Sequence, residues 1–538
     1  MTGALTSSGT SPKEILLTGS RSGMLLLNCE LSGYTGTITT GSSTDTTKGT
    51  WVSLNGAKDA SGVTFHLNSG DNIDTGLLLN YTPTEGSVMK IGALSGNGIV
   101  RSNIEAAATY SLQIGGNNQD ATFSGSIHAG HKNSNYVVEK VGTGTWTITS
   151  DETQYNTGII SGYKNAYTGD TTITEGTLRL GDYDPTTKTG GETGQLGMGE
   201  DSSKMTKIVI GENGTFSIAR NSTIDFYHNI DSNGGTLEVV YNSGDNYYDV
   251  ALRRAITGSF VKTGAGTLSI GTDDVANLTK ITIQEGTLLN FAASRLGNGS
   301  VTVEFTGGTF SEYNAGTVLP NEFRATGDGT LKVVESFTIT GALTGTGTLT
   351  QTGGKTLTLA GGAAESTANL NVTSGTLELA RTNAQHAATN LTLSADTTLL
   401  LSTANQSISG NLTLADGATI QVDLAAFESD AYLVGDPLLD VLAVTGTPSF
   451  TLSYSGEINR STSIPYDPEK IVDGLTVPME SLQAFLDAHM VGGIPELVFS
   501  NGYLVYNTAG LPEPTSWMMF LLGWLLWRRS CTRPGRKG

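Results

Sequence analysis

Cysteine is nearly absent from this chain of 538 residues, which contains only Cys29 and Cys531. Because Cys531 lies close to the C-terminus, we expect no disulfide framework to stabilise the fold. Charged residues make up only 15% of the chain, and long stretches lack the 3.6-residue apolar period of a helix. These two absences exclude a disulfide-rich scaffold and argue against a helical fold.

Basic residues are also scarce, with 30 Lys and Arg against 50 Asp and Glu, so the net charge is −20. Such a surface repels nucleic acid and keeps an exported protein soluble. We therefore expect no nucleic-acid partner.

Recognisable catalytic and metal-binding patterns are missing as well. The sequence has no Gly-x-Ser-x-Gly elbow, no phosphate-binding loop and no Cys-x-x-Cys pair. Its acids form no larger cluster, and we interpret the pairs Asp182 with Asp184 and Asp273 with Asp274, which sit in loop-like stretches, as solvated loop residues. The sequence therefore predicts a protein that is not an enzyme, with no catalytic residue, no metal ligand and no cofactor.

Glycine is abundant, with 70 residues, and much of the chain alternates between polar and apolar residues as strands do. One phrase, Gly-Thr followed by a large apolar residue, returns about every 20 residues with some longer gaps. Its glycines are Gly144, Gly176, Gly214, Gly235, Gly266, Gly286, Gly308, Gly329, Gly347 and Gly375.

A solenoid of short strands explains this phrase. Each turn pairs with the turns above and below it at about 4.8 Å. Glycine permits the positive φ of a corner, threonine suits the pleated surface, and the apolar residue points into a continuous core. At about 20 residues a turn, we expect on the order of 18 turns.

A longer repeat supports this interpretation. Lys140-Val-Gly-Thr-Gly-Thr recurs as Lys262-Thr-Gly-Ala-Gly-Thr, and Ile173-Thr-Glu-Gly-Thr-Leu recurs as Ile283-Gln-Glu-Gly-Thr-Leu. A chain that is merely rich in Gly and Thr does not explain phrases that recur in the same order.

These phrases, with Ala166-Tyr-Thr-Gly-Asp-Thr-Thr, resemble the autotransporter-associated β-strand repeat family over roughly residues 30 to 420. The resemblance implies a right-handed parallel β-helix that serves as an exported passenger. The chain shows no strands for the membrane barrel of an autotransporter, so we expect another export route.

The region 421–510 reads as a C-terminal cap. Residues 478–491 carry apolar side chains at i, i+3 and i+4 spacing, which predicts an amphipathic helix. Residues 497–506 then predict a hairpin with Asn501-Gly502 at its turn.

The tail 511–538 has three parts, which are Pro512-Glu513-Pro514, an apolar segment from Trp517 to Trp527, and Arg528-Arg529. As a helix, the segment would rise roughly 20 Å, short of the ~30 Å of a bilayer core. The tail resembles the PEP-CTERM sorting signal of Gram-negative bacteria. That resemblance implies an exosortase-type processing enzyme as partner and transient or permanent membrane anchoring through the tail. The alternative is an ordinary membrane anchor.

The N-terminus shows no secretory signal in its first 20 residues, so we expect the native start to lie upstream of Met1. We therefore divide the chain into an N-terminal segment, a solenoid, a cap and a sorting tail, whose bounds are 1–29, 30–420, 421–510 and 511–538.

Together these features predict an all-β, right-handed parallel β-helix with a small cap and a short C-terminal hydrophobic helix. We expect it outside the cell or at the envelope, non-catalytic, in an adhesive or structural role that could involve glycans or extracellular matrix. One alternative is a β-helix polysaccharide lyase or hydrolase. Another is a secreted glycan-binding module, for which Tyr241, Tyr247 and Tyr248 are the candidate contacts, expected to be exposed and coplanar.

Overall fold

The computed structural model describes part of the chain in detail. The described residues are 5–6, 13–17, 23–41, 49–56, 58–69, 75–84, 87–102, 108–128, 134–150, 154–156, 161–163, 167, 169–191, 196, 206–244, 247–362, 366–382, 386–428, 437–456, 458, 462–491, 494–500 and 503–507.

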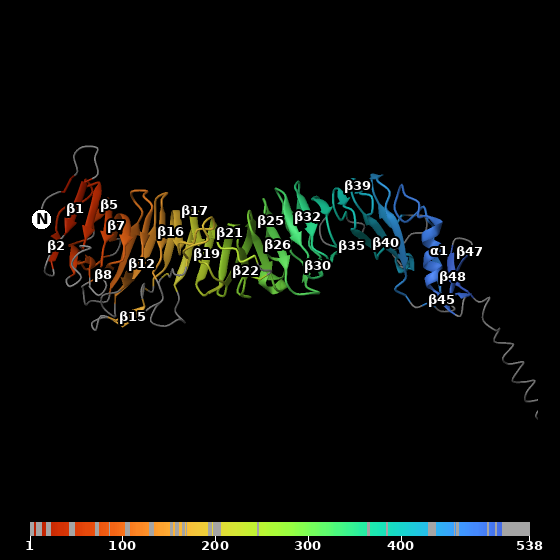
Figure 1. Ribbon diagram of the computed structural model, residues 1–538, viewed down its shortest axis with the longest axis horizontal. Helices are drawn as coiled ribbons and strands as arrows, with labels where there is room; N and C mark the ends of the chain where they lie inside the picture. The colour runs from red at the N-terminus through yellow and green to blue at the C-terminus, as the bar shows by residue number, and fades with distance from the viewer. Residues whose placement is uncertain are drawn as a thin grey trace, which may run out of the picture. The chain divides into compact units, whose positions relative to one another are not determined.

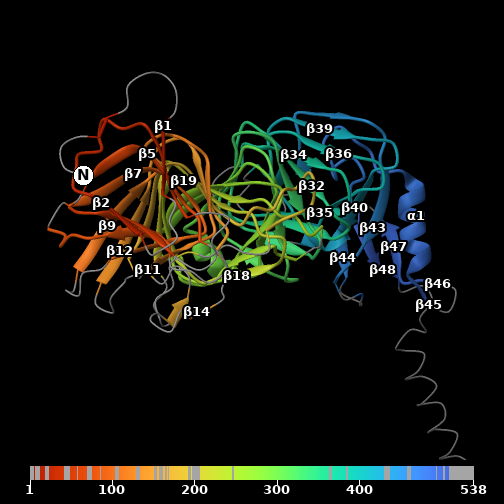
Figure 2. The same cartoon turned by 60° about the vertical axis from the view of Figure 1, so that its left-hand side comes forward.

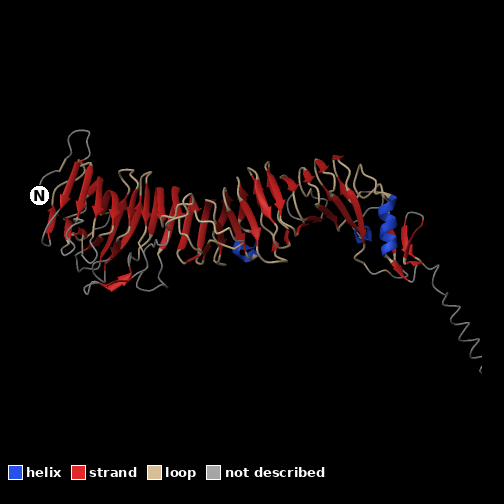
Figure 3. Ribbon diagram, viewed as in Figure 1, coloured by secondary structure: helices blue, strands red, loops and turns tan. Residues whose placement is uncertain are grey.

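The protein is an all-β parallel solenoid of about 15 turns, and helix makes up only 5% of it. This confirms the predicted fold class, and Figure 3 shows how strands dominate the chain. The hydrophobic helix expected within 511–538 lies outside the described residues. Two compact units are distinguished, Met1–Thr358 with Ala363–Asn371, and Leu359–Gly362 with Val372–Gly538.

The first unit is built around a 16-stranded parallel sheet (Figure 1). In spatial order its main path is β1 (Lys13–Leu17), β3 (Gly36–Thr40), β5 (Asp59–Leu67), β7 (Val88–Gly96), β10 (Ala121–Phe123), β13 (Thr145–Ile148), β16 (Thr171–Leu180), β17 (Lys207–Ile218), β19 (Asn229–Val239), β21 (Ile256–Thr263), β23 (Leu278–Ile283), β25 (Thr302–Phe305), β28 (Phe323–Ala325) and β31 (Leu343–Gly345). Off this path, β9 (Ala108–Ile114) pairs with β7 and with β12 (Ser134–Lys140), which in turn pairs with β16.

Further parallel sheets form the other faces of the first unit. One contains β2 (Gly23–Leu27), β4 (Thr50–Leu54), β6 (Gly76–Leu79), β8 (Ile99–Ser102) and β11 (Ser126–His128). Another contains β18 (Ile224–Phe226), β20 (Val250–Leu252), β22 (Thr267–Ile270), β24 (Thr287–Asn290), β26 (Thr309–Glu312), β29 (Gly329–Lys332) and β32 (Thr348–Thr352). The remaining elements are the parallel pair β27 (Val318–Leu319) and β30 (Phe337–Ile339), the antiparallel pair β14 (Gln154–Asn156) and β15 (Ser161–Tyr163), and the 3-10 helix η2 (Ala293–Gly299).

The second unit continues the parallel pattern and then changes it. One sheet contains β35 (Thr376–Arg381), β37 (Thr398–Leu401), β40 (Thr419–Asp423) and β43 (Ser449–Ser453), and another contains β36 (Leu391–Leu393), β39 (Asn411–Leu414) and β42 (Ala443–Thr445). Smaller elements are β38 (Gln406–Ser407) with β41 (Leu439–Asp440) and the 3-10 helix η3 (Leu424–Glu428). The strands β33 (Thr356–Gly361) and β34 (Asn369–Val372) contain residues of both units.

The predicted cap elements are present in the second unit. Helix α1 (Met479–Ala488) buries Leu482 and Phe485, and it packs beside β43 (Figure 2). The antiparallel pair β47 (Leu497–Ser500) and β48 (Tyr503–Tyr506) confirms the predicted hairpin strands, and β44 (Ser463–Pro465) adds to β48. A short pair, β45 (Met490–Val491) with β46 (Ile494–Pro495), follows α1. The Asn501-Gly502 turn itself lies outside the described residues.

The Gly-Thr-apolar phrase behaves as predicted, because its apolar residue points inward. Leu178, Phe216, Leu288 and Phe310 are all fully buried. The phrase nevertheless serves two faces. The threonines of β13, β16, β17 and β19 stack in the large sheet, whereas those of β22, β24, β26 and β29 stack in the sheet that begins with β18.

The number of turns is about 15 rather than about 18. Turns differ in length because some carry long loops between their strands. Lys140 bonds a residue 35 positions further along the chain in the next turn, whereas Lys262 bonds one only 23 positions further along.

Candidate functional site

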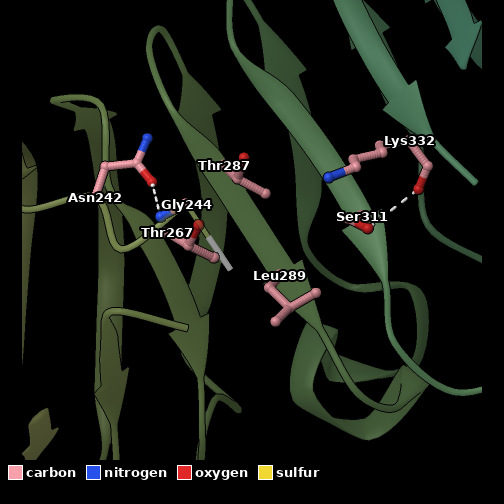
Figure 4. Close-up of a pocket in the computed structure, with 7 residues that line it drawn as sticks. All are labelled: Asn242, Gly244, Thr267, Thr287, Leu289, Ser311 and Lys332. Atoms are coloured by element: carbon pink, nitrogen blue, oxygen red, sulfur yellow. Dashed lines mark hydrogen bonds between the residues drawn. The ribbon is translucent and has the colours of Figure 1, made fainter. Parts of the chain in front are cut away.

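A small groove lies on the outer face of the sheet that contains β22, β24, β26 and β29 (Figure 4). We call it the β22–β29 groove; its volume is about 190 Å³. It is lined by Asn242, Gly244, Thr267, Thr287, Leu289, Ser311 and Lys332. Most of these side chains reach one face because strands alternate: Thr287 and Leu289 lie on the face opposite to Leu288, although Leu289 is itself only 2% exposed.

Parallel register brings the lining residues together from separate turns. Leu289 pairs with Ser311, and Ser311 pairs with Lys332, so three successive strands place one residue each in a row. The Ser311 hydroxyl donates to the Lys332 carbonyl at 3.1 Å. Figure 4 shows the Lys332 amino group pointing back over Ser311.

The segment between β19 and β20 forms one end of the groove. Gly244 N donates to Asn242 Oδ1 at 2.8 Å, which closes a tight turn (Figure 4). Asp249 is buried and anchors the end of this segment, since its carboxylate accepts Ser243 N at 3.0 Å and Thr267 N at 2.7 Å. The Asp249 carboxylate is thereby engaged by backbone amides.

An aromatic patch adjoins the groove, and we define it as Tyr247, Phe291 and Tyr313. The Tyr247 ring centroid lies 5.9 Å from that of Phe291 and 5.7 Å from that of Tyr313, while the last two are 4.8 Å apart. Tyr247 and Tyr313 are 43% and 42% exposed. Leu289 joins patch and groove, because it lines the groove and belongs to the apolar cluster on which Phe291 packs.

The three tyrosines proposed from the sequence are placed differently. Tyr247 is exposed, whereas Tyr248 is only 9% exposed and its ring is tilted 37° from that of Tyr247. Tyr241 packs edge-on against Tyr183 at 5.2 Å, within a separate cluster that contains Ala219. The structure therefore groups Tyr247 with Phe291 and Tyr313, and not with Tyr241.

Phe291 and Tyr313 were not identified from the sequence, although a signal exists. When the phrases that begin at Gly286 and Gly308 are aligned, both aromatics fall on the same position, just after β24 and β26. Parallel pairing then brings the two rings to a centroid distance of 4.8 Å, with their planes tilted by 40°.

A polar network lies beside the patch. Arg253 donates from Nε to the Asp225 carboxylate at 2.9 Å and from Nη2 to the Tyr248 hydroxyl at 2.7 Å. The Tyr248 hydroxyl in turn donates to Asp225 at 3.0 Å. Burial and the Asp225 carboxylate raise the pKa of Tyr248 to about 12. The phenol therefore stays protonated at neutral pH.

Two buried lysines in the first unit perform the same structural task. Lys140 Nζ donates to the carbonyls of Val141, Gly142 and Glu175 at 2.8, 2.6 and 3.2 Å. Lys262 Nζ donates to those of Thr263, Gly264 and Glu285 at 2.8, 2.7 and 3.0 Å. Each ammonium uses all three protons to join the corners of two successive turns. Burial lowers the pKa of Lys140 to about 8 and that of Lys262 to about 7.

The glycines that face these lysines are required by the geometry. Gly176 and Gly286 have φ of +67° and +65°. A Cβ there would lie 2.9 and 2.7 Å from the nitrogen of Lys140 and Lys262 respectively. The repeated lysine and the repeated Glu-Gly-Thr-Leu phrase therefore contact each other and form one corner between two turns. The sequence repeat alone did not reveal this contact.

Other buried polar groups are also held by structural bonds. Glu312 is fully buried, accepts the Asn290 amide at 2.7 Å, and has a pKa raised by desolvation. Arg381 donates to the Ala360 carbonyl at 2.9 Å, and burial lowers its pKa to about 10. His228 lies against Thr206, with Nδ1 3.0 Å from its carbonyl oxygen, and burial lowers the pKa of His228 to about 4.

His228 predicts a loss of stability in acid. Between pH 6.5 and pH 4, His228 is protonated in the unfolded chain but neutral in the folded chain. The free energy of unfolding therefore falls as the pH falls through this range. We expect the wild type to lose about 2 kcal/mol more than His228→Gln between pH 7 and pH 5. Urea unfolding at both pH values measures this difference. Equal losses in the two proteins would contradict the prediction.

No match to this chain is found among protein-family models, curated proteins or solved structures. The sorting-motif residues Pro512, Glu513, Pro514, Arg528 and Arg529 lie outside the described residues. Within the described part, no helix is long and apolar enough to cross a membrane. In the same part, no three side chains of His, Cys, Asp or Glu are grouped so that they could hold a metal ion.

Proposed function

We propose that this chain is an exported, non-catalytic β-solenoid of the bacterial cell surface, with an adhesive or structural role in the envelope or matrix. In this role the repeated outer surface of the solenoid makes the contacts, and the C-terminal tail carries the sorting information. The resemblance of residues 30 to 420 to exported passenger repeats, and of the tail to a PEP-CTERM signal, supports the proposal.

The non-catalytic part of the proposal rests on one observation: the buried charged side chains are engaged in bonds between turns of the solenoid. Strongly shifted pKa values commonly mark catalytic groups. Here Lys140 and Lys262 tie turns together, and Glu312 and Arg381 are bonded to neighbouring turns. These side chains are engaged in stabilising stacked strands, which is what a structural protein requires.

The sorting part of the proposal is tested by changing the tail. Replacing Pro512-Glu513-Pro514 with alanines is expected to abolish processing in a Gram-negative host that carries an exosortase. The variant should then stay with the inner membrane at unprocessed mass. Cell fractionation and mass spectrometry of the full chain give both readouts.

A matched control for this experiment is the pair of substitutions Ser530→Ala and Thr532→Ala, which leave the three-part motif intact. This control should behave as the wild type does. If the wild type and the motif variant are found in the same fraction and have the same mass, the proposal that the tail is a sorting signal is wrong.

The alternative function is a carbohydrate-active enzyme, and the observation that favours it is the Asp225–Arg253–Tyr248 network. A carboxylate and a phenol are groups that can act as general acid or base on a polysaccharide, and a cation beside them can stabilise negative charge. Against it, a Tyr248 pKa of about 12 keeps the phenol protonated at neutral pH, so that it cannot take a proton from a substrate, and its proton is already donated to Asp225. Incubation with polyuronates, followed by ultraviolet detection of unsaturated sugar products, distinguishes the two functions. Product formed by the wild type and lost in Arg253→Gln would establish the enzyme.

A further inference from the structure

We propose that the β22–β29 groove and the aromatic patch together bind an acidic polysaccharide that carries uronate groups. The inference names a partner for the surface protein proposed above and rests on that function for its biological setting. The binding itself is a property of the folded chain and can be measured whether or not export occurs as proposed.

The first argument is the chemistry of the lining. The hydroxyl of Thr287, which is partly exposed, and the side-chain amide of Asn242 offer hydrogen-bonding groups to a ligand. The Ser311 hydroxyl donates to the Lys332 carbonyl, so it can only accept from a ligand. Sugar rings present alternating hydroxyls that need such partners. The groove volume of about 190 Å³ is below the ~300–1,000 Å³ of sites that enclose a drug-sized ligand. It therefore suits one ring of a chain that continues across the surface.

The second argument is the position of the aromatic rings. Tyr313 follows Ser311 by two residues and Phe291 follows Leu289 by two, so ring and groove residues share one face of adjacent strands. Tyr247 packs against both of these rings, and it belongs to the segment between β19 and β20 that also supplies Gly244 to the groove. A saccharide ring in the groove thus has exposed aromatic surface beside it, where its C–H face can pack.

The third argument is charge. The chain carries a net charge of −20, yet the groove lining includes the cation of Lys332 and, within the described residues, no carboxylate. The nearby Asp249 carboxylate is held by two backbone amides. At the patch, the Arg295 guanidinium lies 5.0 Å from the Phe291 ring centroid, which adds a second cation. Two cations beside a lining that contains no described carboxylate favour an anionic sugar over a neutral one.

The test uses the purified full-length chain and calorimetric titration with oligogalacturonate, with maltooligosaccharide as the uncharged probe. We expect binding of the acidic oligomer, weakened by salt, and much weaker binding of the neutral one. The double variant with Tyr247→Ala and Tyr313→Ala should bind about tenfold more weakly or worse. Lys332→Glu should lose acidic binding without changing the response to the neutral probe.

The matched control is Tyr227→Ala, because Tyr227 is equally exposed, at 44%, but lies outside the patch. It should bind as the wild type does, and thermal unfolding of each variant separates lost binding from lost folding. Absence of acidic binding by the folded wild type would overturn the inference. Equal affinity for both probes, or unchanged affinity in Lys332→Glu, would also overturn it. None of these outcomes bears on the fractionation result, so the two proposals fail separately.

Discussion

Replacing Lys262 with methionine is expected to lower the free energy of unfolding by about 3 kcal/mol, because three buried carbonyl groups lose their donor. Lys262 is fully buried and its ammonium is bonded to Thr263, Gly264 and Glu285. Methionine has a similar length and cannot donate. Urea unfolding of wild type and variant at neutral pH measures the change.

The control is Lys207→Met, since Lys207 is 41% exposed and lies near Asp170 and Asp231 at 3.7 and 3.6 Å. Exposed ion pairs of this kind contribute roughly 0–1 kcal/mol, so the control should change stability little. If the free energy of unfolding falls by the same amount in both variants, the bonds of the buried Lys262 ammonium do not stabilise the fold.

The same lysine has a signature in pH. Its folded pKa of about 7 lies below the 10.5 of an exposed lysine. Between those values the unfolded chain binds more protons, so the free energy of unfolding rises with pH. The wild type should therefore gain more stability than Lys262→Met between pH 7 and pH 9.

Phe310→Ala is expected to destabilise the solenoid by about 3–5 kcal/mol, the range for removing a large buried side chain. Phe310 is fully buried and packs against Phe323 and Phe337 at centroid distances of 5.0 and 6.2 Å. The cost includes both lost apolar burial and the cavity left in the ladder. The midpoint of denaturant unfolding, compared with that of the wild type, measures it.

Thr309→Ala provides the comparison on the same strand. Thr309 faces outward from β26 while Phe310 faces inward, so its replacement should change stability by less than about 1 kcal/mol. A similar loss for both substitutions would mean that β26 does not alternate between core and surface as described.

Periodicity was enough to predict the architecture, for a physical reason. Equivalent strands of successive turns all bury the same face, so each turn must place an apolar residue at the same position. This pattern is visible along the chain. Residues such as Leu178 and Leu288 were therefore assigned inward correctly. Helix α1 was visible for a similar reason, as its apolar spacing differs from that of the strands around it.

Contacts made by segments outside the repeated phrases could not be predicted in the same way. Aligning the phrases of β24 and β26 pairs Phe291 with Tyr313, but Tyr247 lies in the segment between β19 and β20, whose position the repeat does not fix. For the same reason Tyr241 and Tyr247, close in sequence, pack in different clusters. The partners of Lys140 and Lys262 were equally hidden, because a lysine in a strand is usually expected at the surface.

The two lysine corners have a consequence for how such a chain can change. The same three-carbonyl arrangement closes across 35 residues at Lys140 and across 23 residues at Lys262. One corner geometry therefore accommodates enclosed segments that differ by 12 residues. We expect foreign peptides of about this length, grafted into the segment that Lys262 encloses, to leave the corner intact and to be displayed on the solenoid.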